Sequence, residues 1–173
     1  MTNLKPDTIE FDIDRDKFLR QLIRELALCL EEIVGIDEAS GLISIVAHRM
    51  GLDYSKKYKT EFSELTMTPK LVGDILVDFK RRIGGDFFLI SADNNTIILG
   101  NRRCPFEDKV LNRPALCMMT TNVFGVITSQ LLGYAKVHLQ NTIASGDHEC
   151  RVLIYLNDKT AADEGKEFFR VVG

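Results

Sequence analysis

The stretch FFLISADNNTIIL, residues 87–99, decides the fold class that this sequence predicts. It opens with an apolar run and continues with Ala92-Asp93-Asn94-Asn95, a composition typical of a turn. It ends in the β-branched and apolar residues of 96–99. Two short apolar runs joined by a turn predict a β-hairpin.

The chain before this hairpin has helical periodicity. A first helix is expected to begin at Asp14 or Asp16 and to end at Gly35, with apolar residues at three-and-four spacing. A second is expected between Asp37 and Gly51. The short link through Gly35 predicts that these two helices form an antiparallel pair. Residues 1–13 resemble an extended arm, and residues 52–67 follow no clear pattern.

A third helix is expected at Thr68-Pro69, because threonine is a good N-cap and proline suits the first turn. Gly84-Gly85 would end it.

After the hairpin, Asn112-Arg113-Pro114 opens another predicted helix, which Gly133 ends. Residues 134–143 and 151–156 predict a second hairpin, and residues 161–169 a last helix. No βαβ alternation occurs, so we expect an α+β fold, in which N-terminal helices accompany a small antiparallel sheet of two hairpins with helices packed on it.

A single domain over residues 1–173 is predicted, with a helical N-terminal part at 1–67 and an α+β core at 68–173.

The composition excludes several classes of function. Of 173 residues, 45% are hydrophobic and 27% charged, which allows a packed core, and the net charge of −3 argues against a nucleic-acid partner. We find no signal peptide, no apolar run long enough to span a membrane, and no phosphate-binding glycine motif. We therefore expect a cytoplasmic protein without a membrane partner, in which thiols stay reduced.

Three cysteines in the C-terminal half are the sharpest chemical feature. Cys104 follows the first hairpin within Arg-Arg-Cys-Pro-Phe, and Cys150 begins the last predicted strand. Cys117 lies near a helix N-terminus, where the helix dipole is expected to stabilise a thiolate. Cys29 lies beside Leu26 and Leu30 in the first helix and is interpreted as a small buried hydrophobe.

Three interpretations of these cysteines stay open. Cys117 and Cys150 can be buried core residues. Cys104, Cys117 and Cys150 can instead hold zinc or an iron–sulfur cluster, with His148 or Asp147 as a further ligand, although the chain has no Cys-x-x-Cys pair. In the third interpretation Cys104, in its loop, is a reactive or redox-active thiol. A cysteine-dependent enzyme that uses His148 or His138 as a base is the alternative function.

Several motifs together resemble one family. They are CPF at 104–106, PALCMMTTNVFG at 114–125, GYAKV at 133–137, TIASGD at 142–147 and CRVLIYL at 150–156. The run is similar to the methanogen output domain family, found in prokaryotic signalling proteins beside receiver, kinase or phosphatase modules. More distantly it is similar to the 4-vinyl reductase domain, whose superfamily includes heme-nitric-oxide sensors and TRAPP trafficking subunits.

The resemblance implies a helical N-terminal half, a small antiparallel sheet, a homodimer formed through N-terminal helices, and a sensory or output role. In the 4-vinyl reductase relatives, late cysteines bind zinc beside a small-molecule pocket. Cys150 matches such a cysteine, but no second cysteine follows it and no Glu-x-x-Cys precedes it.

We therefore expect a regulatory sensor domain that holds a metal, iron–sulfur or redox centre through Cys104, Cys117 and Cys150. Its expected partners are a second copy, a signalling protein or fused output module, and a small-molecule ligand. The alternatives are a cysteine-dependent hydrolase or tetrapyrrole-type reductase, and a ligand-binding interaction module.

Overall fold

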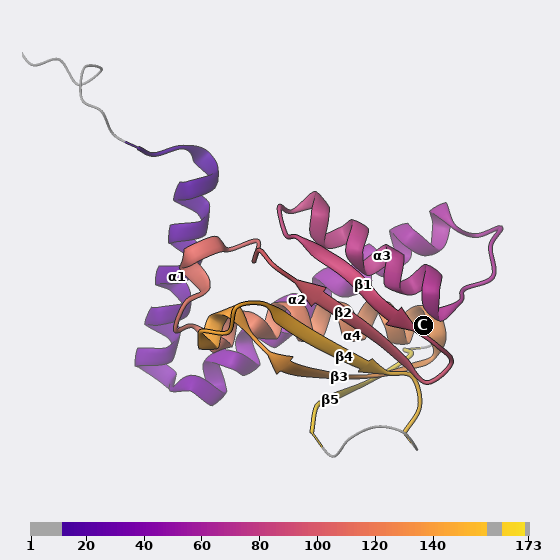
Figure 1. Ribbon diagram of the computed structural model, residues 1–173. Coiled ribbons are helices and arrows are strands. Elements are labelled where there is room, and N and C mark those ends of the chain that lie inside the picture. Colours follow the sequence, from indigo (N-terminus) through magenta and orange to yellow (C-terminus); the bar gives the residue numbers. More distant parts are fainter. Residues whose placement is uncertain (1–11, 159–163, 172–173) are drawn as a thin grey trace, which may run out of the picture.

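The computed structural model describes residues 12–158 and 164–171 and shows an α+β fold, as the sequence predicts (Figure 1). The α-helices are α1 (Arg15–Val34), α2 (Ile36–Glu61), α3 (Pro69–Arg82) and α4 (Cys117–Leu132). The strands are β1 (Phe87–Ala92), β2 (Thr96–Asn101), β3 (Tyr134–Asn141), β4 (Cys150–Tyr155) and β5 (Lys166–Phe169). Short 3₁₀ turns η2 (Glu107–Val110), η3 (Pro114–Leu116) and η4 (Ile143–Ser145) connect them.

The sheet has the strand order β1-β2-β4-β3-β5, and every neighbouring pair is antiparallel. The two predicted hairpins, β1–β2 and β3–β4, are therefore confirmed. They join along β2 and β4, where the pairing runs from Thr96 opposite Tyr155 to Asn101 opposite Cys150. This seam brings the end of β2 next to the start of β4.

The predicted helix at 161–169 is wrong where the structure describes it, because residues 166–169 form β5 and pair with β3; residues 161–163 lie outside the described residues. Phe168 is buried and its neighbour Phe169 is exposed, because successive side chains of a strand point to opposite faces. The Phe168 ring packs where Gly125 of α4 has no side chain, since a Cβ on Gly125 would lie 2.1 Å from that ring. A four-residue strand is too short to show its period clearly.

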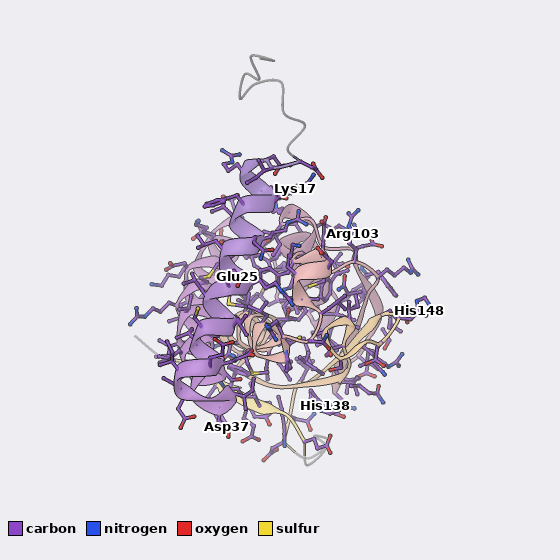
Figure 2. All side chains as sticks on the ribbon, turned by 90° about the vertical axis from the view of Figure 1, so that its left-hand side faces the viewer. Lys17, Glu25, Asp37, Arg103, His138 and His148 are labelled. Atoms are coloured by element: carbon purple, nitrogen blue, oxygen red, sulfur yellow. The ribbon has the colours of Figure 1, made fainter. Side chains whose placement is uncertain are left out.

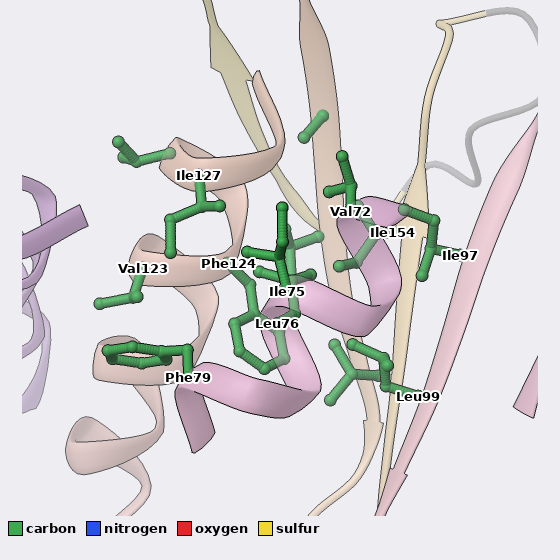
Figure 3. Close-up of a cluster of buried hydrophobic side chains, with 14 of the residues drawn as sticks. Val72, Ile75, Leu76, Phe79, Ile97, Leu99, Val123, Phe124, Ile127 and Ile154 are labelled. Atoms are coloured by element: carbon green, nitrogen blue, oxygen red, sulfur yellow. The ribbon is translucent and has the colours of Figure 1, made fainter. Parts of the chain in front are cut away.

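The main core lies between the sheet and the helices behind it in Figure 1. Figure 3 shows Val72, Ile75 and Leu76 of α3 meeting Phe124 of α4 and Ile154 of β4. All five are at most 2% exposed, so their burial is a main source of stability.

Helix α2 is longer than predicted. Gly35, at φ 85°, separates α1 from α2, so Asp37 lies within the first turn and is not the cap. Gly51 does not end the helix, because α2 packs closely on α4 there and a Cβ would lie 2.8 Å from Val126 Cβ. The predicted antiparallel pair is also wrong, since α2 leaves α1 and runs behind the sheet toward the far side of the molecule (Figure 1).

Within the described residues, one stretch, Pro114–Leu132, is long and apolar enough to pass as a membrane-crossing helix. In the fold 67% of its most apolar 18-residue window is buried, as in the core helix of a soluble protein. The sequence had predicted no such stretch, and its burial supports a soluble protein.

Candidate functional site

The three cysteines Cys104, Cys117 and Cys150 line one small cavity at the end of the β2–β4 seam. We call it the cysteine cavity; its volume is about 30 Å³. Its walls are mostly apolar and come from α3, the sheet, α4, η4 and the loop after β2. The lining side chains are those of Lys80, Phe87, Asn101, Cys104, Pro105, Phe106, Val110, Leu116, Cys117, Thr120, Leu139, Thr142, Ile143, Ala144, Cys150 and Val152.

Each cysteine reaches the cavity from the end of a rigid element. Cys150 begins β4 opposite Asn101, the last residue of β2, and Cys104 follows Asn101 by three residues. Cys117 is the first residue of α4. The Sγ of Cys150 accepts hydrogen bonds from Ile143 N at 3.4 Å and from Asn101 Nδ2 at 3.7 Å, which fix its orientation. The pairing of β2 with β4 therefore brings Cys104 close to Cys150, and the start of α4 adds Cys117 to the same cavity.

Lys80, in the last turn of α3, brings an amine into this apolar space. Nζ donates a hydrogen bond to Thr120 Oγ1 at 2.8 Å and lies 5.2–5.8 Å from the ring centroids of Phe79, Phe87 and Phe124. Among the described residues it forms no ion pair with a carboxylate. Burial lowers the pKa of Lys80 to about 8, because the charged form loses its hydration.

Burial also keeps the thiols of Cys104 and Cys117 protonated. It raises the pKa of Cys104, and it raises the pKa of Cys117 to about 12. The prediction of a thiolate at Cys117 is therefore wrong, because the pKa of this thiol is raised and not lowered. The helix N-terminus does lie at this residue, but loss of water in the apolar cavity has the larger effect.

His148, the predicted further metal ligand, is exposed and does not line the cavity. Figure 2 shows it at the right-hand edge of the molecule, away from α1. Asp147 is used locally, because its Oδ2 accepts from Thr142 N at 2.7 Å and closes the turn before β4. Over residues 12–158 and 164–171, no group of three or more His, Cys, Asp or Glu side chains is placed to hold a metal ion. This arrangement does not fit zinc or an iron–sulfur cluster, and that centre stays a prediction.

The other sequence candidates lie outside the cavity. His138, on β3, faces Glu164, with Nε2 3.8 Å from a carboxylate oxygen. Cys29, which was expected to be buried, is exposed on α1.

Residues 102–113 form one wall of the cavity, and we call them the wall segment. Cys104, Pro105, Phe106 and Val110 of this segment line the cavity. Glu107 and Asn112 have φ angles of 52° and 57° within it, a left-handed conformation that non-glycine residues adopt at some cost. The segment is thus held in shape by its contacts more than by its own preferences.

Helix α1 is bonded to the outside of the wall segment. Arg24 Nη1 donates to the carbonyl oxygens of Lys109 at 2.6 Å and Leu111 at 3.0 Å. Arg20 Nη1 lies 2.6 Å from Glu107 Oε1. Ala27 of α1 packs in a small buried cluster with Val110, Leu116 and Ala144. All three of these partners also line the cavity.

A second hollow of about 190 Å³, here the outer groove, lies between α1, α2, α3 and the wall segment. It shares Lys80, Pro105 and Phe106 with the cysteine cavity. These three side chains therefore lie between the cysteine cavity and the outer groove.

Lys80 was missed at the sequence level because it stands in a basic cluster with Arg81 and Arg82. A signal was available, since Lys80 follows Leu76 by four residues and so lies on the apolar face of α3. No comparable signal in the sequence indicated the role of Arg20 and Arg24. Arg24 binds backbone carbonyls and Arg20 binds the carboxylate of Glu107, and these partners are distant in sequence.

The comparisons with known proteins agree with the fold. The family profile described as methanogen output domain 1 matches residues 22–155. No curated protein sequence matches the chain.

Two solved structures have the same fold. The phenol-responsive sensory domain of the transcription activator PoxR, solved with phenol, has a TM-score of 0.61 at 18% identity, covering 84% of this chain and 76% of that one. A trafficking protein particle complex subunit 3 from Naegleria fowleri, covalently bound to palmitic acid, has a TM-score of 0.58 at 12% identity, covering 90% of this chain and 98% of that one. At these identities the likeness shows the fold alone.

Proposed function

We propose that this chain, which belongs to the methanogen output domain 1 family, is the sensor part of a signalling protein that binds a small ligand in the cysteine cavity. Membership of an output-domain family supports the signalling role. The observation that carries the rest is that one piece of chain, the wall segment, both lines the cavity and is bonded to α1.

This connection gives a route from ligand to signal. A ligand that enters from the outer groove has to pass Lys80, Pro105 and Phe106. Movement of Phe106 shifts the neighbouring turn η2, whose carbonyl at Lys109 accepts a bond from Arg24. The bonds to α1 then either carry α1 along or break. Both outcomes change the position or order of α1, which is the requirement for a ligand-driven switch.

The size of the cavity limits the ligand. A buried water needs about 10–15 Å³ of such space, whereas an engineered cavity that binds benzene has about 150 Å³. The cysteine cavity, at about 30 Å³, is therefore far smaller than a site for benzene, and phenol is larger still. The ligands of the two similar structures, phenol and palmitic acid, would require the wall segment to move away. We propose a ligand smaller than either.

The proposed partner is a second copy of this chain, held by α1 and the start of α2. Most of the large exposed apolar side chains belong to this surface: Phe18, Leu19, Leu22, Ile23, Leu26, Ile33, Val34, Ile36, Leu42, Ile45 and Val46. With about half of each exposed, they form an area above the few hundred Å² that ordinary monomers show and near the roughly 800 Å² that each partner buries in a standard interface. In Figure 1, α1 stands at one side of the molecule, free to meet a partner.

Leu26→Glu tests this dimer, because a carboxylate in its centre would have to be buried unpaired. We expect a dimer for the unmodified chain and a folded monomer for the variant, by sedimentation equilibrium. Glu25→Gln, an exposed neighbouring change, should leave the dimer intact. Stable dimers persist at protein concentrations on the order of 100 µM. If the unmodified chain is a monomer at that concentration, the proposal that its partner is a second copy is contradicted.

A metal or redox centre at Cys104, Cys117 and Cys150 stays the alternative function. The buried thiols of Cys104 and Cys117 are poor ligands and slow nucleophiles until they lose the proton, which also weighs against a cysteine-dependent enzyme that uses them. Metal and sulfide analysis of protein purified without oxygen checks this alternative. If the protein contains stoichiometric zinc, or iron with sulfide, the metal centre would be favoured over the proposed small-ligand site.

Hydrogen exchange of the α1 amides tests the coupling. A panel of acids, amides and alcohols of up to about four heavy atoms is added, following the cavity volume. We expect at least one compound to change exchange in both the wall segment and α1. Arg24→Ala should still bind it but confine the change to the wall segment, while Arg15→Ala, exposed at the start of α1, should behave as the unmodified chain. Binding without any change in α1 would overturn the proposed route.

A further inference from the structure

Lys80 is 4% exposed and is the only residue with a formal charge among the described residues that line the cysteine cavity. Its amine has one hydrogen-bond acceptor, the hydroxyl of Thr120. The nearby rings of Phe87 and Phe124 interact favourably with a cation, but they do not neutralise it. The cavity therefore contains a positive group without a matching negative one.

This arrangement does not benefit the fold. Burying an amine without a counter-charge opposes folding, and a methionine of similar length would fill the same space without that cost. Side chains that destabilise the fold are commonly found where a ligand binds. Lys80 is accordingly better explained by what it binds than by what it packs against.

The remaining polar groups also suit an anion. Thr120 can donate its hydroxyl proton, and the thiols of Cys104 and Cys117 are weak S–H donors while burial keeps them protonated. No aspartate or glutamate is among the described lining residues. A negative oxygen placed here would gain a charge-assisted bond to Lys80, which is roughly twice as strong as a neutral one.

Volume then selects the kind of anion. About 30 Å³ accommodates roughly two water molecules, which corresponds to a ligand of about two to four heavy atoms. The apolar side chains of Phe87, Leu116 and Val152 leave room for a methyl group but give it no polar partner. A carboxylate with a very short apolar end fits both properties.

We propose that the cysteine cavity binds a small monocarboxylate, of the formate and acetate class, with its oxygens against Lys80 Nζ and Thr120 Oγ1. The proposal rests on the proposed function, since it names the class of ligand that the same cavity takes. The short apolar end of the acid lies toward Phe87 and Leu116, and the ligand replaces the counter-charge that Lys80 lacks.

Titration calorimetry with sodium acetate and with acetamide, at constant ionic strength set by chloride, tests this. Acetamide has the same shape without the charge. We expect acetate to bind at least ten times more tightly than acetamide. Lys80→Met should fold and lose acetate binding by at least tenfold, whereas Lys70→Met, an exposed lysine on the same helix, should bind as the unmodified chain does.

Thiol labelling places the binding site. In a Cys29→Ser background, which removes the exposed thiol, acetate should slow the alkylation of Cys104 and Cys117. Calorimetric binding of acetate without such protection would mean a site elsewhere and would overturn the proposal.

The outcomes separate the two proposals. If acetate and acetamide bind equally well, and alkylation of Cys104 and Cys117 abolishes both, the role of charge is overturned. The proposal that the cavity binds a small ligand would then still stand. Binding of neither compound, and of no other member of the panel of small molecules, would overturn both. Tighter binding of benzoate than of acetate would overturn the size limit.

Discussion

Helix α1 and the core around α4 contain apolar side chains in similar abundance, but they use them in opposite ways. Phe124 and Ile127 of α4 are fully buried between the sheet and the other helices, whereas Phe18 and Leu26 of α1 are about half exposed. The core is therefore held by burial, which is strong and non-directional. Helix α1 buries only Ala27 and packs on α2, and directional bonds from Arg20 and Arg24 join it to the wall segment. A region held by a few such bonds can be released by a small change at the other end of them.

The largest expected effect is on stability, and it compares a substitution in the core with one on α1. Phe124→Ala should lower the free energy of unfolding by about 3–5 kcal/mol, because it leaves a cavity in the centre of the core. Leu22→Ala on α1, where the side chain is 42% exposed, should change it by less than about 0.5 kcal/mol in the monomer. Urea unfolding at low protein concentration measures both. Similar losses for the two variants would remove the distinction between the regions.

The next effect concerns the buried charge beside the cavity. Lys80→Met should raise the free energy of unfolding at pH 7 by on the order of 3 kcal/mol, since the pKa of Lys80 falls from its ordinary 10.5 to about 8. The lowered pKa opposes folding fully below pH 8. Between pH 8 and 10.5 the unfolded chain binds more protons than the folded one, so the unmodified chain gains stability and the difference shrinks.

Urea unfolding of both proteins at pH 7 and pH 10 checks this sign. The buried thiol of Cys117 acts in the opposite direction, because its pKa, raised to about 12, gives stability that is lost as the pH rises above 9. That contribution is common to both proteins and largely cancels in the difference. A difference that stays constant or grows with pH would contradict an uncompensated amine at Lys80.

A smaller, local effect tests the bonds that hold α1. Arg24→Ala removes two hydrogen bonds from a charged group, each of which contributes on the order of 1.5–3 kcal/mol where it is buried and less where it is exposed. We expect α1 amides to exchange roughly ten times faster while the amides of α4 stay unchanged. Arg15→Ala serves as the control. Faster exchange in α4 would show that α1 and the core unfold as one unit.

The sequence could predict the parts of the fold that depend on neighbouring residues. Asp14 accepts from Lys17 N and Thr68 accepts from Leu71 N, as their N-cap chemistry indicates, and both hairpins lie where turn residues separate apolar runs. The errors lie where distant contacts decide. Gly51 continues a helix because it meets Val126, and Phe168 belongs to a strand because Gly125 leaves space for its ring.

The site shows the same division. The cysteines were found because they stand at the ends of elements, and the pairing of β2 with β4 together with the packing of α4 on the sheet brings those ends to one cavity. Their protonation could not be predicted, because the pKa of Cys117 depends on the absence of water around it and not on its place in α4. Lys80 was missed because a lysine beside two arginines resembles a solvated surface, and only its spacing from Leu76 indicates the inner face.

The β2–β4 seam also determines when during folding a binding site can exist. Each hairpin can form from local sequence, but Asn101 and Cys150 are 49 residues apart, and their pairing requires a long loop to close. The cavity walls come from both hairpins and from α3 and α4, so no intermediate with a single hairpin has the cavity. A ligand of this site therefore meets only chains that have completed their folding, and its binding slows unfolding without helping the earlier steps.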